Sequence, residues 1–125
     1  MASPDTVVNL DEKFALFTDH WAPKILGQIN DLHLKAVKID GEFVWHKHAA
    51  TDEFFLVRSG ILTIQMRGRD DVTIGSSEFF IVPKGVEHRP VAAEPCEVLL
   101  IEPAGLVNTG DGDVSERTAC QDVWI

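Results

Sequence analysis

Three histidines and one acid, gathered in two short stretches, constrain the fold of this chain most strongly. His46 and His48 form a His-x-His pair, and Glu53 follows shortly after them. His88 comes much later, behind the turn residues 83–85. Side chains two positions apart on a strand point to the same face, so His46 and His48 share one face. This pattern predicts a mononuclear metal site inside a β-barrel, because only a closed barrel brings His88 back to the others.

Short strand-like segments separated by turn residues fill most of the chain. We expect strands at about 42–49, 52–58, 61–67, 72–74, 78–82, 86–92 and 97–102. An earlier period-two pattern begins at Leu32 and predicts one more strand, with His33 on its wetter face as a surface or edge histidine. No helical pattern occurs among these segments, which predicts an all-β antiparallel sandwich or barrel.

A short helix is expected before the strands, at about residues 9–21. Asn9 and Glu12 resemble a capping box, and Pro23 would end the helix. Four apolar residues recur at helical spacing: Leu10, Phe14, Phe17 and Trp21. We expect this stripe to pack as a lid against the barrel or as a dimer contact.

The C-terminal residues 104–125 are expected to form an extended tail. Its part from Gly105 to Gln121 is polar and reads as a long connection, which is either functional or mobile. The chain then ends in the apolar residues 123–125. We expect this end to dock on the body of the protein or on a neighbouring subunit, since it would otherwise expose apolar surface.

Composition excludes several classes of partner. The chain of 125 residues has 11 Lys and Arg against 20 Asp and Glu, a formal net charge of −9, which disfavours nucleic acid. No apolar run approaches the ~18 residues of a membrane span, and no signal-peptide pattern occurs. Cys96 and Cys120 lack a CxxC spacing and read as unpaired thiols of a reducing compartment. We therefore expect a single-domain cytoplasmic protein without membrane contact.

The four candidate ligands suit a divalent transition metal. Imidazole nitrogens with one carboxylate bind Fe, Mn, Ni, Zn or Cu, and the pattern does not choose among them. Four protein ligands that face a cavity leave one or two positions for water or substrate, which is typical of a catalytic or ligand-binding centre. The alternative is a set of hydrogen-bonded core histidines without metal.

The same residues resemble the two motifs of the cupin family. His46, His48, Glu53 and Gly60 match the first motif, and Pro83, Gly85 and His88 match the second. Three positions depart from the family pattern: Gly41 lies one residue too near the histidines, and Ser77 and Ala92 stand where glycine and asparagine are usual. These departures affect turns and a position that is not a ligand. The resemblance covers roughly residues 36–103.

The resemblance implies a double-stranded β-helix, or jelly roll, in one cupin domain spanning 1–125, with a barrel core at about 32–103. Carried over by position, His46, His48, Glu53 and His88 are the metal ligands. The resemblance also implies a homodimer, with the helical stripe and the strand near 32–39 as interface elements. The chain is similar to small cupins labelled mannose-6-phosphate isomerase-like, a label that names a fold relationship and not that activity.

The function that the resemblance implies is metal-dependent chemistry on a small organic molecule, of dioxygenase, isomerase or lyase/cyclase type. Glu53 is a ligand or, off the metal, a base. The chain has no tyrosine, which excludes a tyrosyl general base. The alternatives are a non-catalytic metal-dependent binding or sensing module and a metal-free structural barrel. A titratable residue deep in the cavity that is not a ligand would favour the enzyme, and the sequence reveals none.

A phosphate pocket is not favoured. Lys47 and Arg89 are each offset by one position from a ligand, so both should point outward. Arg58 is out of phase with Glu53. Only loop cations could still reach the cavity: Arg67, Arg69 and Lys84.

Overall fold

The part of the chain that the structure describes folds into a jelly roll of seven antiparallel strands with one short helix. The computed structural model describes residues 5–112 and 123–125. The elements are α1 (Leu10–Phe14), β1 (Lys24–Ile29), β2 (Leu32–Glu42), β3 (Glu53–Ser59), β4 (Leu62–Met66), β5 (Val72–Ile74), β6 (Phe79–Val82) and β7 (His88–Pro103). Strands run in the order β1-β2-β7-β3-β6, and β4 pairs with β5 and β7. This confirms the predicted all-β class.

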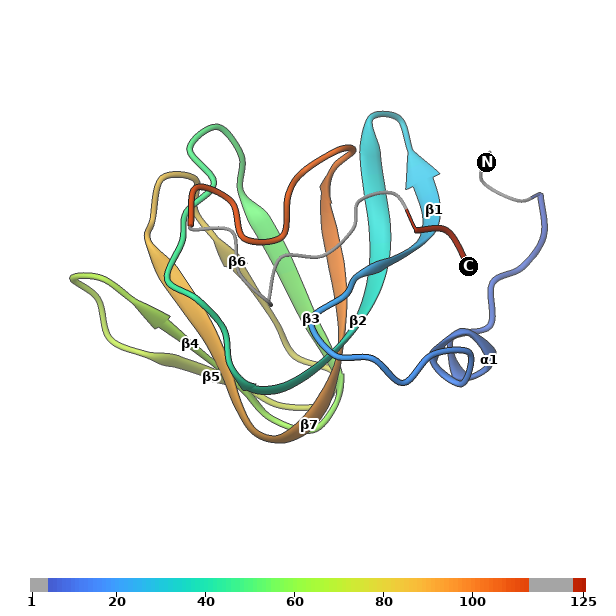
Figure 1. The fold of residues 1–125 in the computed structure, drawn as a ribbon, viewed down its shortest axis with the longest axis horizontal. Helices are drawn as coiled ribbons and strands as arrows, with labels where there is room; N and C mark the ends of the chain where they lie inside the picture. Colours follow the sequence, from blue (N-terminus) through green and yellow to red (C-terminus); the bar gives the residue numbers. More distant parts are fainter. Residues whose placement is uncertain (1–4, 113–122) are drawn as a thin grey trace.

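Strand β7 closes the barrel because it changes partners along its length. Its first residues, from His88 to Val91, pair with β4, whereas its pairing with β2 begins at Val91 and its pairing with β3 begins at Glu97. The sequence predicted two strands here, at 86–92 and 97–102, where the structure has one continuous strand of 16 residues. Figure 1 shows β7 sweeping around the lower end of the molecule and joining the two layers.

The predicted strand at 42–49 is wrong except for a single bridge. Beyond Glu42 the chain is irregular, and only His46 pairs with another strand residue, His88. Strand β3, which carries Glu53, pairs with β6 and β7, so Glu53 approaches the two histidines from another wall of the barrel.

The N-terminal helix is correctly placed but much shorter than the predicted 9–21. Asn9 caps it through its side chain, as expected, yet the helix ends at Phe14. Phe14 and Phe17 pack on the outer face of the sheet, whereas Trp21 inserts among the barrel residues and stacks on Phe43 with ring centroids 4.7 Å apart. A straight helix cannot serve both sides of a sheet, so the chain unwinds between them. The stripe thus packs on the chain's own barrel, and the homodimer stays a prediction.

The inner face of β2 is the opposite of the one the sequence suggested. His33 and Lys35 are only 4% and 6% exposed, and they share their face with the core residues Val37 and Ile39. The prediction of a surface His33 is therefore wrong. Its ring lies edge-on to Trp124, with centroids 5.6 Å apart. The polar residues His33 and Lys35 resemble a solvent-exposed face in the sequence, because the residues that they contact come from distant segments of the chain.

The C-terminal end docks on the body, as predicted. Backbone hydrogen bonds join Ile25 to Val123 and Ile125, at 2.7 and 3.2 Å. The predicted long connection is described only as far as Gly112, and the rest of it lies outside the described residues. Among the described residues, no helix is long and apolar enough to cross a membrane.

Cys96 is a packing residue of the inner core. Its side chain is 1% exposed, and burial, with a smaller effect of Glu97, raises the pKa of its thiol to about 11. It is a free thiol, as expected. Cys120 lies outside the described residues.

Candidate metal centre

A backbone bridge brings the first and last of the predicted ligands together. The amide of His46 donates to the carbonyl of His88 at 3.0 Å, and the amide of His88 donates to the carbonyl of His46 at 2.8 Å. This reciprocal pair sets the two imidazoles side by side, with ring centroids 4.3 Å apart. The turn before His88 makes the pairing possible, because Gly85 adopts a φ of 78° and its amide bonds to the carbonyl of His48.

Two of the imidazoles are oriented by the backbone. Nδ1 of His46 lies 2.9 Å from the carbonyl of Val44, and Nδ1 of His88 lies 2.9 Å from the carbonyl of Val86. A carbonyl partner places the proton on Nδ1 and leaves Nε2 with its lone pair, which is the usual arrangement of a metal-binding histidine. His48 has no such partner: within the described part of the chain, neither of its ring nitrogens makes a hydrogen bond.

Glu53 begins β3 and points between the histidines. Its Oε1 lies 3.3 Å from Nε2 of His88 and 3.5 Å from Nε2 of His48. Phe55 and Val57 follow it on the same inner face, because alternate residues of a strand share a face. The side chains of all four candidate ligands are buried, between 1% and 4% exposed.

The electrostatics of the cluster favour a neutral His46 and an ionised Glu53. Burial, helped by the neighbouring His88, lowers the pKa of His46 to about 4. Burial would raise the pKa of Glu53, but the imidazoles of His48 and His88 outweigh it and hold that pKa well below its usual range. Neutral imidazole and carboxylate are the forms that bind a metal.

The donor set fits one metal ion. One ligand atom from each of His46, His48, Glu53 and His88 lies within 4.8 Å of the others. Two donors on opposite sides of a first-row ion are separated by about 4 Å, so the cluster needs little movement to close on one. The ring nitrogens of His48, which make no hydrogen bond within the described residues, also favour a bound ion, because buried polar atoms without partners are costly unless something binds them.

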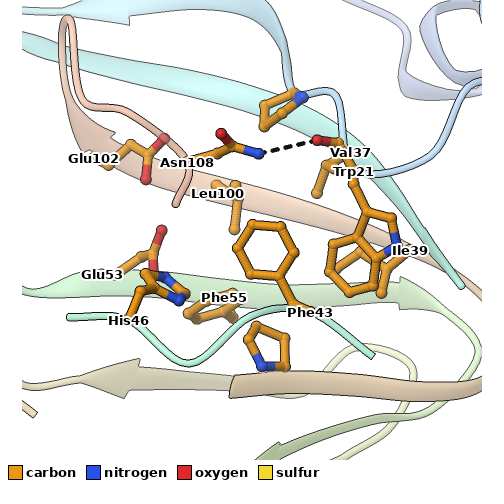
Figure 2. A pocket seen from close by; sticks show the side chains of 12 residues that line it. Trp21, Val37, Ile39, Phe43, His46, Glu53, Phe55, Leu100, Glu102 and Asn108 are labelled. Carbon is orange, nitrogen blue, oxygen red and sulfur yellow. Dashed lines mark hydrogen bonds between the residues drawn. The ribbon is translucent and has the colours of Figure 1, made fainter. Parts of the chain in front are cut away.

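A small apolar cavity opens beside the cluster. It measures about 30 Å³, enough for water or for the reacting group of a small molecule. Its walls are mostly apolar and include Trp21, Val37, Ile39, Phe43, Phe55 and Leu100. Figure 2 shows His46 and Glu53 at one end of this space, the ring of Trp21 at the other and the ring of Phe43 between them. The cluster is therefore lined up with a cavity and is not closed within the core.

Glu102 is the cavity residue that sequence reasoning missed. It is 1% exposed, and Figure 2 shows its carboxyl group beside that of Glu53. Lys35 donates to its Oε1 at 2.9 Å, while its Oε2 has no hydrogen-bond partner in the described part of the chain. Burial, together with the charge of Glu53, raises the pKa of Glu102 well above its usual range, although Lys35 opposes this. The available signal was its position in β7, two residues after the inward Leu100.

The described lysines and arginines do not line the cavity, as their positions along the strands predicted. Among the described residues, no lysine or arginine lines the cavity. Arg58 pairs with Asp11 and Glu97, and Arg89 pairs with Glu42 at 2.7 Å. The loop cation Arg67 pairs with Glu87 on the outside, and Arg69 and Lys84 are exposed.

The fold and the four-residue cluster define the cupin class, and comparison with known proteins agrees. The cupin domain model of the cupin-2 type matches residues 34–102, more than half of the chain. The chain belongs to the cupin family. This confirms the predicted small cupin, and cupins usually bind a metal ion.

Individual relatives extend this likeness without assigning a reaction. A cupin-2 domain containing protein of Shewanella frigidimarina is 47% identical, with a TM-score of 0.75 over 78% of this chain and 94% of that one. The uncharacterized protein YdbB of Bacillus subtilis is 30% identical over 51% of this chain; the chain spans 57% of that relative's length. Hydroquinone 1,2-dioxygenase of Sphingomonas sp. TTNP3 is 17% identical, with a TM-score of 0.72 over 82% of this chain and 35% of that one. That last likeness shows the shared fold alone.

Proposed function

We propose that this cupin is a metal-dependent enzyme that acts on a small organic molecule. His46, His48, Glu53 and His88 hold the ion, and the reaction is a dioxygenation, an isomerisation or a lyase/cyclase step. One observation carries the proposal: two of the four clustered donors, His46 and Glu53, line a cavity that also holds a second buried carboxyl group, that of Glu102. A purely structural metal site is closed, whereas a catalytic one faces a space for substrate.

The residues around the cavity have distinct roles in this proposal. A bound divalent metal supplies Lewis-acid polarisation of a substrate oxygen. Trp21 and Phe43 exclude water from the apolar end of the cavity. Glu102 binds a donor group of the substrate through Oε2, because Lys35 holds Oε1 and fixes the orientation of the carboxyl group. The absence of lysine and arginine among the described lining residues disfavours a phosphorylated substrate.

Turnover by the metal-loaded protein tests this proposal. Protein loaded anaerobically with Fe(II) is mixed with oxygenated buffer and a panel of catechols, diketones and thiols, and oxygen uptake is recorded. Phenols join the panel because the 17%-identical dioxygenase was crystallised with 4-nitrophenol. A parallel set loaded with Zn(II) is followed by NMR for isomerised or cleaved products. We expect turnover of at least one compound in one of the two sets.

Replacing Glu102 with glutamine should lower that turnover by roughly 2–10-fold, the value of a single buried hydrogen bond. The bound metal should stay at the wild-type level, since Glu102 is not one of the four ligands. Glu87→Gln is the matched control, because Glu87 lies on the outside in a pair with Arg67. Equal rates for the Glu102 variant and the wild type would contradict the proposed contact with substrate.

A non-catalytic binding or sensing module is the second candidate function. The small apolar cavity beside the cluster favours it, since such a space also suits retention of a ligand. This module would bind members of the same panel without consuming them. If calorimetry detects binding and neither metal supports turnover, the result would favour the binding or sensing module over the enzyme.

A further inference from the structure

The segment that follows β7 lies against two of the proposed metal ligands. Residues 105–112, which we call the strap, run from β7 across the open end of the barrel. Figure 1 shows the strap in orange-red, passing toward the segment that precedes β3. The amide of Asp111 donates to the carbonyl of Lys47 at 3.2 Å, and its Oδ1 accepts from the amide of Lys47 at 2.7 Å. The strap is therefore tied to the residue that lies between His46 and His48.

Gly110 is the point of the strap that lies beside both imidazoles with no room for a side chain. A Cβ added at Gly110 would lie 2.5 Å from the carbonyl oxygen of Lys47, 3.1 Å from Cδ2 of His46 and 3.1 Å from Cε1 of His48. Real Cβ atoms essentially never approach other atoms as closely as the first of these distances. A side chain at this position must therefore displace the rings or the Lys47 backbone.

His48 differs from the other two candidate histidine ligands in how its ring is oriented. His46 and His88 are oriented by carbonyls that bind their Nδ1 atoms, but His48 has no hydrogen-bond partner in the described part of the chain. Metal-binding histidines are normally held by an outer hydrogen bond that fixes the ring. The ring of His48 has only Nε2 near a polar group, 3.5 Å from Oε1 of Glu53, so its orientation depends on the atoms around it, and Gly110 lies on one side of the ring.

The strap also reaches the far wall of the cavity. The side chain of Asn108 donates to the carbonyl of Trp21 at 3.1 Å, and both residues line the cavity. Figure 2 shows this hydrogen bond above the ring of Phe43. The strap therefore lies beside the candidate ligands at one point and is hydrogen-bonded to the cavity wall at another.

We propose that Gly110 is a positioning residue of the metal centre, whose backbone holds the imidazoles of His46 and His48 in the orientation that binds the ion. The inference rests on the proposed metal-binding role of the cluster and adds to it a residue outside the cupin motifs. Gly110 itself is neither a ligand nor a catalytic residue.

Gly110→Ala tests the inference with Gly105→Ala as its matched control. Both glycines have positive φ, +53° and +82°, so alanine strains the backbone at each, but a Cβ at Gly105 meets no atom within 4 Å. Co(II) is titrated into metal-free protein, and both the affinity and the visible ligand-field spectrum are recorded. We expect Gly110→Ala to bind Co(II) roughly 10–100-fold more weakly with an altered spectrum. Gly105→Ala should match the wild type in both.

Asp111→Ala provides a second route that does not insert an atom into the site. Near-UV circular dichroism first establishes that each variant is folded. Loss of the Asp111 side chain frees the strap from the Lys47 amide, so we expect a weaker Co(II) affinity and a spectrum shifted in the same sense. Wild-type affinity and spectrum in folded Gly110→Ala, or in Asp111→Ala if the former does not fold, would overturn the inference. Absence of Co(II) binding by the wild type would instead remove the proposed function, and this inference with it.

Discussion

Replacing His48 with alanine should lower the bound metal from one ion per chain to well below one. His48 is 4% exposed, its ring nitrogens make no hydrogen bond in the part of the chain that the structure describes, and one of its nitrogens lies within 4.8 Å of the other candidate donors, which suits coordination of an ion. Loss of an outer partner of a ligand costs about 10–100-fold in metal affinity, and loss of a ligand should cost at least as much. Elemental analysis of the dialysed variant measures the outcome.

His20→Ala is the control for this variant. His20 is exposed and lies before the first strand, so its loss should leave the metal content at the wild-type level. An unchanged stoichiometry in the His48 variant would contradict the ligand assignment. A parallel fall in both variants would show that the loss has nothing to do with coordination.

Replacing Lys35 with methionine should lower the free energy of unfolding by about 1–3 kcal/mol, the typical cost of leaving a buried polar group without one of its partners. Lys35 donates to Glu102 at 2.9 Å, and the two side chains are only 7% and 1% exposed. Methionine fills much of the space of lysine but leaves the carboxyl group of Glu102 buried with one partner fewer. Urea unfolding at neutral pH measures the loss.

Two further variants isolate the buried pair as the cause. Lys24 pairs with Asp19 at 2.7 Å, but that carboxylate is 54% exposed, so Lys24→Met should cost about 1 kcal/mol or less. The double change of Lys35 and Glu102 to methionine should recover most of the loss, since an apolar pair of similar volume is often neutral. Equal costs for Lys35→Met and Lys24→Met would contradict the account of the buried pair.

The grouping of the candidate ligands could be predicted from local pattern. The spacing of His46 and His48 puts them on one face, and the glycine turn before His88 reverses the chain at the right place. The structure brings these residues and Glu53 together, within 4.8 Å of one another. Local pattern did not predict which strands carry Glu53 to the histidines: it lies on β3, which pairs with β6 and β7.

The lining of the cavity could not be predicted in the same way. Lys35 and Glu102 each look like a solvent-facing polar residue when read along their own strands. Only the pairing of β2 with β7 places the two charges together inside the barrel. Gly110 is also unremarkable in sequence, since its importance comes from contact with His46 and His48.

The predicted length of the helix was wrong for a related reason. Helical spacing from Leu10 to Trp21 is genuine, but spacing does not reveal that Phe14 and Trp21 belong to opposite faces of one sheet. Packing decided the outcome here, and a five-residue helix with a turn after it satisfies both contacts. Periodicity predicted which residues are buried and misjudged what they pack against.

The metal content of the wild-type protein tests the central claim most directly. Protein is purified without chelators, dialysed against metal-free buffer and measured by elemental analysis across the first-row transition metals. We predict one divalent ion per chain, held by His46, His48, Glu53 and His88. Protein that contains no such ion, and takes up none when Fe, Mn, Ni, Zn or Cu is offered in excess, would contradict the claim.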